Sequence, residues 1–186
     1  MFGCSAQYPR RNPLGERFPS VVGQALDGTD ISIPGDLVGK PVVLIIAFEK
    51  NAQFDADRWL LGLLQGKLTT PLYEVPTIPG TLPGLFASKI DEGMRGGIPK
   101  EDWATVVTVY GDADKIAQFT GNSRRQNTRV VVLDEQGVVR YFHDRGYSAR
   151  LVPVVVDLTT DLARFASLRI DEGLDSFEVP AYRALR

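Results

Sequence analysis

The stretch PVVLIIAF, residues 41–48, decides the fold. It holds no charged or polar side chain, and Val42, Val43, Ile45 and Ile46 are branched at Cβ. A continuous apolar run of this kind is typical of a strand that is buried on both faces of a sheet. It is also far too short to cross a membrane as a helix. We therefore expect residues 41–48 to form the central strand of a domain.

After this strand, the hydrophobic pattern alternates between helical and extended spacing. Apolar residues recur at helical intervals between residues 52 and 65, which predicts a helix that ends at Gly66. The same reasoning predicts strands over residues 72–78 and 105–110 and helices over residues 82–94 and 112–119.

Two hairpins flank this core. Asp27-Gly28 marks a turn within residues 24–33, and a second turn at residues 135–137 joins two runs of β-branched residues within 129–142. A last helix is predicted over residues 148–168, with Pro153 in its first turn.

This order of elements predicts an α/β fold. Strands that alternate with helices pair in parallel, and the late hairpin adds antiparallel strands to a mixed central sheet. We expect helices on both faces of that sheet and a hairpin at its N-terminal end. The domain is expected over residues 18–168, between a flexible segment or tether at 1–17 and a polar tail at 169–186.

The composition excludes several classes of function. One cysteine and one histidine among 186 residues rule out a dithiol centre, a disulfide framework within one chain and a zinc site built on these ligands. A net charge of −2 offers no basic excess for nucleic acid. We therefore predict no metal, no cofactor and no nucleic-acid partner.

Two stretches resemble a known superfamily. They are FPSVVGQALDGTDISIPGDLVGKPVVLIIAF, residues 18–48, and TRVVVLDEQGVVRYFHDRG, residues 128–146. Their order is similar to that in the thioredoxin-like superfamily, in its peroxiredoxin and extracytoplasmic-thioredoxin branch. The resemblance implies a thioredoxin-like fold over residues 18–168.

The chain departs from that branch at both hallmarks of its redox site. The redox members carry one or two cysteines where the core strand enters the next helix, because the helix N-terminus stabilises a thiolate. Residues 49–55 contain no cysteine here. Those members also usually carry a cis-proline before the closing hairpin, and residues 126–129 contain no proline. The resemblance therefore implies a fold without its thiol chemistry.

A narrower resemblance points to assembly proteins. LYEVPTI, residues 72–78, and DEGMRGGIP, residues 91–99, look like a cysteine-lacking thioredoxin-like group that includes the mitochondrial F-type ATP synthase assembly factor. What that resemblance implies is a protein partner, bound without catalysis.

Candidate binding residues lie in three segments. Glu49, Asn51 and Gln53 could bind a ligand or partner at a helix N-terminus, or Asn51 could simply cap the helix of a solvated loop. The proline-rich residues 75–86 are either a docking surface or a rigid connector. The apolar members that could form a docking surface are Ile78, Leu82, Leu85 and Phe86.

The third segment is basic. Arg124, Arg125 and Arg129 either contact an anionic group on a partner or face water. Arg95 follows a helix end in a glycine-rich turn, and it would reach the same site if that turn folded back towards residues 49–53. His143 has no serine nucleophile motif to serve, so no catalytic residue is predicted.

Cys4 lies between Gly3 and Ser5, as the lipidated cysteine does in a bacterial lipoprotein signal. The charged and apolar stretches that precede such a cysteine would require a start further upstream. With a lipid on Cys4, the protein is predicted in the bacterial cell envelope and touches the membrane only through that lipid. Without it, we expect a cytoplasmic protein.

Three functions remain open from these observations. The leading one is a non-catalytic thioredoxin-like module that binds or assembles a protein partner, either untethered or as a lipoprotein. The alternative is a peroxiredoxin-like or transferase enzyme that borrows a thiol from solution. It needs a deep polar pocket formed by Asn51, Gln53, Arg95 and Arg129. The third is a structural lipoprotein without a ligand.

Overall fold

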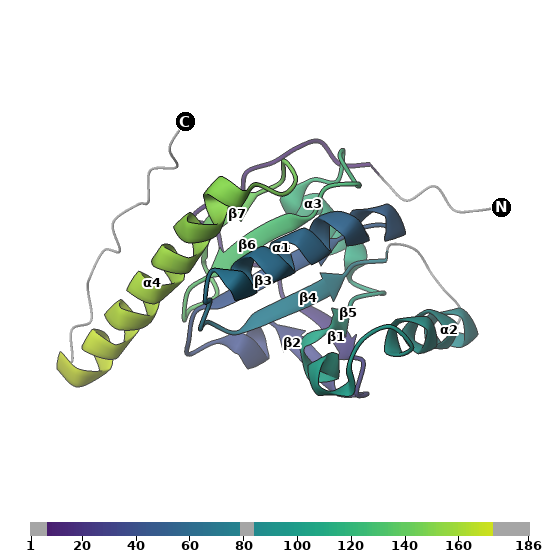
Figure 1. Ribbon diagram of the computed structural model, residues 1–186, viewed down its shortest axis with the longest axis horizontal. Helices are drawn as coiled ribbons and strands as arrows, with labels where there is room; N and C mark the ends of the chain where they lie inside the picture. The colour runs from purple at the N-terminus through teal and green to yellow at the C-terminus, as the bar shows by residue number, and fades with distance from the viewer. Residues whose placement is uncertain (1–6, 79–83, 173–186) are drawn as a thin grey trace.

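The computed structural model describes residues 7–78 and 84–172, in which two small sheets and four α-helices pack together (Figure 1). Short 3-10 turns lie between the main elements, at Gly35–Leu37, Lys50–Ala52, Lys100–Thr105 and Ala149–Leu151. The order of hairpin, strand, helix, strand, helix, strand, helix, hairpin and helix agrees with the order that the sequence predicts.

The main sheet has four strands in the order β4-β3-β6-β7. Their bounds are β3 Val42–Ala47, β4 Leu72–Pro76, β6 Arg129–Leu133 and β7 Val139–His143. β3 pairs in parallel with β4 and antiparallel with β6, which forms a hairpin with β7. The prediction that residues 41–48 form a central, doubly buried strand is confirmed, since β3 has a partner on each side and a helix layer on each face.

The second sheet joins the first hairpin to a short strand, in the order β2-β1-β5. β1 Val21–Ala25 and β2 Asp30–Ile33 turn at Asp27-Gly28, where Gly28 has a φ of 97° that favours glycine. β5, predicted over residues 105–110, is only Val107–Thr108. The segment divides its hydrogen bonds between β1 and single bridges to β4, so a continuous ladder does not form.

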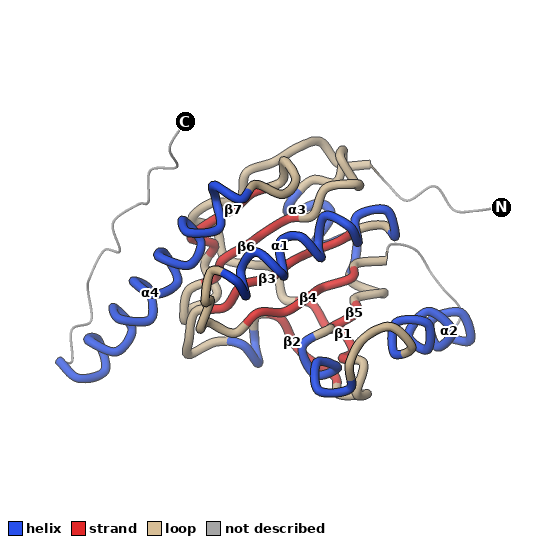
Figure 2. The backbone as a smooth tube through the Cα atoms, viewed as in Figure 1, coloured by secondary structure: helices blue, strands red, loops and turns tan. Residues whose placement is uncertain are grey.

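Helices cover both faces of the main sheet, as predicted (Figure 2). α1 Gln53–Gln65 and α4 Val152–Glu172 pack against one face around Trp59, Leu63, Val155 and Leu158. α3 Ala113–Thr120 and the β1–β2 hairpin cover the other face. Burying apolar side chains on both faces stabilises the sheet by about 25 cal/mol for each Å² removed from water.

α2 Gly84–Arg95 lies to one side of both sheets (Figure 1). Polar contacts of Asp91 and Arg95 help to hold it there. Tyr110 donates a hydrogen bond to Asp91 at 2.8 Å, and Arg95 donates one to the carbonyl of Leu26 at 2.7 Å. α2 is therefore attached near the β1–β2 turn rather than on the face of the main sheet.

The N-terminal segment differs from its prediction. Residues 1–17 were expected to be flexible, but residues 7–17 run along the domain. The Tyr8 amide donates a hydrogen bond to the side-chain oxygen of Asn122 at 2.7 Å, and the Gly15 amide donates one to the Val139 carbonyl at 2.8 Å. The segment is held because it forms hydrogen bonds with distant parts of the domain, and the hydrophobic pattern of the sequence does not reveal such pairing.

At the other end, α4 extends four residues beyond the predicted end at Leu168, to Glu172. The rest of the predicted tail, from residue 173, lies outside the described residues. In the part of the chain that the structure describes, no helix is both long and apolar enough to span a membrane.

Candidate functional site

The candidate site is the edge of the main sheet where α1 begins. β3 and β4 end at this edge, β6 begins there, and β7 ends there, because β6 is antiparallel to β3 and β7. The loops at this edge are residues 48–53, 77–78, 121–128 and 144–148. We call this region the loop edge.

Asp55, in the first turn of α1, joins two loops of this edge. Its Oδ2 atom accepts hydrogen bonds from the Thr128 amide at 2.9 Å and the Thr128 hydroxyl at 2.7 Å. Its Oδ1 atom accepts a hydrogen bond from the Tyr147 amide at 2.6 Å. Hydrogen bonds to an ionised carboxylate are short and roughly twice as strong as neutral ones. The helix start, the strand start at β6 and the loop after β7 are thus tied together by one side chain.

Aromatic rings close the same region on the α1 side. Trp59 is fully buried and packs edge-on against Tyr147 and His143, at ring distances of 5.4 and 5.5 Å. Arg58 lies 4.5 Å above the Tyr147 ring. A Cβ atom at Gly62 would lie 3.0 Å from the Tyr147 hydroxyl, a tight contact that would make the Tyr147 ring shift. Tyr147 therefore lies wedged against α1.

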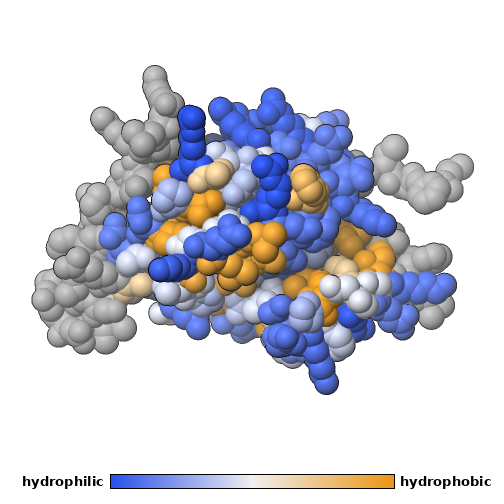
Figure 3. Space-filling view, in the orientation of Figure 1, coloured by the Kyte–Doolittle hydropathy of each residue, from blue (hydrophilic) through white to orange (hydrophobic). Residues whose placement is uncertain are grey.

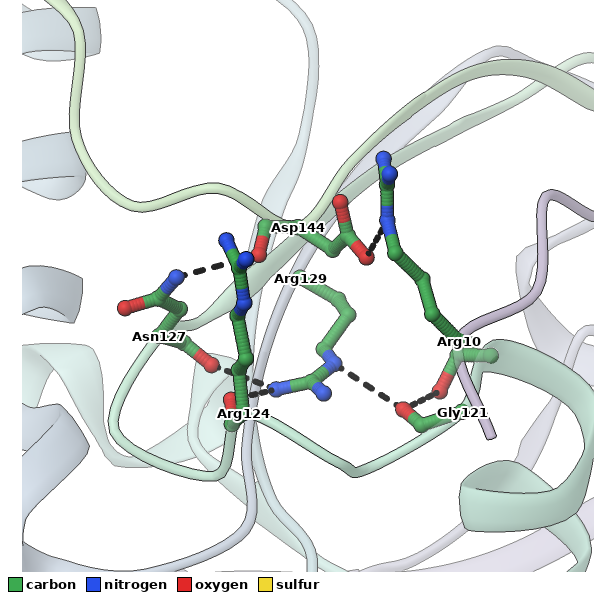
Figure 4. A network of polar contacts seen from close by, with 7 residues as sticks. Arg10, Gly121, Arg124, Asn127, Arg129 and Asp144 are labelled. Carbon is green, nitrogen blue, oxygen red and sulfur yellow. Dashed lines mark hydrogen bonds and ion pairs between the residues drawn. The ribbon is translucent and has the colours of Figure 1, made fainter. Parts of the chain in front are cut away.

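Arg129 is buried beneath the loop edge, which corrects the prediction that it belongs to a surface basic patch. Its side chain is 2% exposed. The guanidinium donates hydrogen bonds to the carbonyls of Gly121 at 3.1 Å, Arg124 at 2.8 Å and Asn127 at 2.5 Å (Figure 4). It also lies 4.8 Å over the Phe48 ring. Arg129 thus fixes the loop that carries Thr128 to Asp55 and is not available to a partner.

Asp144 supplies the negative charge of this network. Its Oδ2 atom accepts a hydrogen bond from Arg10 at 2.6 Å, and its backbone carbonyl accepts one from Asn127 at 3.2 Å (Figure 4). Burial lowers the pKa of Arg129 to about 10, and the charge of Asp144 acts in the opposite direction. Asp144 Oδ1 is buried and has no hydrogen-bond partner among the described residues.

The predicted loop residues divide by exposure. Asn51 and Gln53 are exposed, and Glu49 is half-buried, so all three can meet a partner at the start of α1. The alternative in which Asn51 caps the helix is wrong, because the chain enters α1 through a 3-10 turn and no described side chain caps it. Gln53 instead donates a hydrogen bond to Asp57 at 2.8 Å.

Arg95 does not reach the loop edge. It contacts Leu26 and lies 5.7 Å over the Trp103 ring, beside the β1–β2 turn. That turn is near the start of β4, because β1 is antiparallel to β5 and β5 bridges β4 in parallel. The loop edge is at the other end of β4. The pocket that would unite Asn51, Gln53, Arg95 and Arg129 therefore does not form.

The docking residues fall partly outside the described chain. Ile78 lies at the loop edge, half-buried, with its amide bonded to the Val109 carbonyl at 2.9 Å. Leu82 is outside the described residues, as is Cys4, and of Phe86 the structure describes only the backbone position in α2. The use of residues 75–86 as a docking surface stays a prediction.

An open groove of about 720 Å³ lies on the α3 side of the molecule. Tyr8, Pro9 and Phe119 form its apolar wall. Its three cations are each engaged within the chain: Arg10 with Asp144, Arg11 with Glu16 and Lys115 with Asp112. The groove is where residues 8–11 lie on α3, and it is not part of the loop edge.

One carboxylate elsewhere has a strongly shifted pKa. Glu74 on β4 is half-buried, and its Oε1 atom has no hydrogen-bond partner among the described residues. Burial raises the pKa of Glu74 to about 7, and the charges of Asp57 and Asp102 act in the same direction. Glu74 can therefore gain or lose a proton near neutral pH.

The sequence did not identify Asp55, Thr128 or Tyr147. An acidic residue in the first turn of a helix is a common feature that favours the helix on its own. Partners that lie 73 and 92 positions away leave no mark in local spacing. The sequence analysis predicted antiparallel strands from the late hairpin, but not the pairing of β3 with β6 that brings Thr128 to the start of α1.

The sequence matches no protein-family model and no curated protein sequence. Solved structures, by contrast, superpose over most of the chain. BsSco, a member of the Sco family of cytochrome c oxidase assembly proteins, is 12% identical with a TM-score of 0.54, covering 82% of this chain and 98% of its own.

Two further structures extend the comparison. The exposed lipoprotein thioredoxin of Streptococcus pneumoniae strain TIGR4 is 11% identical with a TM-score of 0.51, covering 77% of this chain and 100% of its own. A thiol:disulfide interchange protein of the thioredoxin family from Chlorobium tepidum TLS is 14% identical with a TM-score of 0.50, covering 81% and 99%. At this level of identity the likeness defines the architecture alone, and the chain has a thioredoxin-like fold.

Proposed function

We propose that this protein is a non-catalytic thioredoxin-fold module that binds or assembles other proteins through its loop edge. The observation that supports this most is that the Asp55 carboxylate is bonded to two loops of the loop edge. At the start of α1, where redox relatives are expected to hold a thiolate, the nearest carboxylate accepts three hydrogen bonds from the chain itself. A polar group that is satisfied in this way is not free to activate a substrate.

The thiol-borrowing enzyme has less support. It requires four polar residues around one deep pocket, and two of them are engaged elsewhere. Arg129 is buried among backbone carbonyls, and Arg95 contacts Leu26 at the far end of β4. The exposed side chains of Asn51 and Gln53 remain at the loop edge, where they suit recognition of a partner's backbone or polar side chains.

Assembly is the form of binding that we favour. BsSco, which shares this fold, is a member of a family of cytochrome c oxidase assembly proteins. The narrower resemblance of residues 72–78 and 91–99 to an assembly-factor group points the same way. The exposed lipoprotein thioredoxin of Streptococcus pneumoniae offers a precedent for carrying such a domain on a lipid anchor. We propose the same role for Cys4, and an acyl group on Cys4 in mass spectra of the native protein is the expected result.

Two measurements test the function. With insulin or peroxide as substrate and glutathione supplied, the wild-type protein and Cys4→Ser should both react at the rate of the protein-free mixture. Turnover above that rate, in either protein, would contradict the proposal.

The second measurement is capture of native partners by the full chain. Gln53→Ala should lose captured proteins that the wild type retains. Gln65→Ala is the matched control, because it makes the same exposed change at the far end of the same helix. Equal capture by Gln53→Ala and wild type would remove the start of α1 from the binding surface.

A further inference from the structure

The outer side of α1 exposes large apolar side chains. Phe54 is 73% exposed, and Leu61 and Leu64 are each 57% exposed. Apolar residues gather in the middle of the face that α1 presents (Figure 3). Single exposed apolar residues are common, but neighbouring ones on one helix mark a contact surface.

Phe54 and Leu61 form a stripe with a defined charge pattern, and Leu64 lies about 60° around the helix from Leu61, on the side of Asp57. A helix has 3.6 residues per turn, so Phe54 and Leu61, seven positions apart, lie almost in line along its axis. Asp57 and Arg58 project on opposite sides of that line, since they differ by 100° around the helix. Both are exposed. The stripe therefore has an apolar centre with a negative flank and a positive flank.

We propose that a second copy of this chain covers the stripe, with the two α1 helices side by side and a two-fold axis running along the line from Phe54 to Leu61. That symmetry places Phe54 against the other Phe54 and Leu61 against the other Leu61. It also brings Asp57 of each chain opposite Arg58 of the other, on both sides of the axis. A two-fold interface must be complementary to itself, and this charge pattern meets that condition.

The charges also select the orientation. In an antiparallel arrangement of the two helices, residues on the same flank would meet, so Asp57 would oppose Asp57 and Arg58 would oppose Arg58. Like charges in contact disfavour that arrangement. Arg58 is already held beside the stripe, 5.7 Å from the Phe54 ring and 4.5 Å from the Tyr147 ring, so little ordering is needed on association.

The predicted dimer is weak. One stripe on one helix is smaller than the roughly 800 Å² per partner that stable complexes bury, so a dissociation constant on the order of 10 μM or higher is expected. The stripe runs along the outer side of α1, and the loop edge lies at its N-terminal end. The inference therefore does not depend on the proposed function.

Charge exchange between chains tests the inference directly. Analytical ultracentrifugation of the full chain, from about 1 μM to 1 mM, should show the wild-type mass rising towards that of a dimer. Asp57→Arg carries two positive residues on the stripe, and Arg58→Asp carries two negative ones. Each variant alone should remain a monomer.

An equimolar mixture of the two variants restores opposite charges on both flanks, so the mixture should form a heterodimer. Asp57→Arg/Arg58→Asp should self-associate like the wild type. Phe54→Ser should weaken association by at least about 10-fold. A wild type that stays monomeric to 1 mM, a mixture that stays monomeric, or an Asp57→Arg protein that dimerises as well as the wild type would each overturn the inference. Circular dichroism of each variant, expected to match the wild type, separates these outcomes from misfolding.

Discussion

Phe54 and Asp55 are neighbours in the chain, yet they belong to opposite kinds of surface. The Asp55 carboxylate accepts three hydrogen bonds from the loop edge, whereas the Phe54 ring is 73% exposed. At the loop edge the Asp55 carboxylate and the Arg129 guanidinium are satisfied within the chain. On the outer stripe of α1 apolar groups are left uncovered.

This difference separates two ways of using one helix. Satisfied polar groups rigidify a region and remove it from chemistry with outside molecules. Uncovered apolar groups contribute little to folding but gain free energy when a partner removes them from water. A thioredoxin-like domain without a cysteine at this helix start can therefore keep Asp55 as a structural joint, while the exposed Asn51 and Gln53 of the loop edge and the stripe of α1 remain for association.

If the loop edge is a structural joint, replacing Arg129 should cause the largest loss of stability. Arg129→Met leaves one buried and two partly buried hydrogen bonds to carbonyls without their donor, so a loss of about 3 kcal/mol in the free energy of unfolding is expected. Urea denaturation followed by circular dichroism measures it. Arg124→Met changes an exposed arginine side chain in the same loop and keeps the backbone carbonyl that Arg129 bonds, so it should change stability by less than about 0.5 kcal/mol. Equal losses in both would mean that burial of Arg129 is not what matters.

Asp55 gives the next largest effect. Asp55→Ala removes the acceptor of three hydrogen bonds and should cost about 2 kcal/mol. Asp57→Ala removes an exposed carboxylate two residues later, with a cost of at most about 0.5 kcal/mol. The urea midpoints of the two variants measure this difference. An Asp55→Ala protein as stable as the wild type would contradict the role of Asp55 as a joint.

The raised pKa of Glu74 predicts that the free energy of unfolding depends on pH. Its pKa is about 7 in the folded protein and near 4.5 when unfolded, so the folded state holds the proton more tightly. Stability falls as pH rises from about 4.5 through 7, because ionisation of the buried carboxyl then opposes folding. Glu74→Gln removes this cost, and a gain of about 2 kcal/mol is expected at pH 8, with little gain at pH 4. Thermal unfolding at both values checks it; equal gains at pH 4 and pH 8 would show that Glu74 does not titrate as described.

The smallest effect on stability belongs to the stripe. Phe54→Ser should change the free energy of unfolding by less than about 0.5 kcal/mol, because the ring is mostly in water. Thermal denaturation at low protein concentration, where the chain is a monomer, measures this value. A loss above about 1 kcal/mol would place Phe54 in the folded core and remove it from the association surface.

Most of the fold followed from local patterns. The apolar run 41–48, the helical spacing of residues 52–65 and the two hairpin turns each carry their own signal, because strands and helices bury side chains at fixed intervals. β5 was overestimated, since apolar spacing does not show that its partners lie in two different sheets. Residues 7–17 were expected to be flexible because their composition is polar, and their pairing with distant backbone groups has no local signal.

The site was harder to predict than the fold. The resemblance implied that residues 49–55 and 126–129 belong to one former redox site, and the structure brings both to one edge of the sheet. It could not reveal that Arg129 turns inward, because a charged residue at the start of a strand is usually exposed and its burial depends on carbonyls from a loop. The prediction for Arg95 was wrong for a similar reason, because the path of α2 decides where this side chain lies.

Hydrogen exchange of the Thr128 and Tyr147 amides tests the closed loop edge most directly. Both amides donate to Asp55, so in the wild type they should exchange slowly with solvent. In Asp55→Ala both should exchange at least about 10-fold faster, while the Val131 amide in the middle of β6 should speed up only by the factor that the loss in global stability requires. Fast exchange at Thr128 and Tyr147 in the wild type, or rates that Asp55→Ala leaves unchanged, would contradict the account.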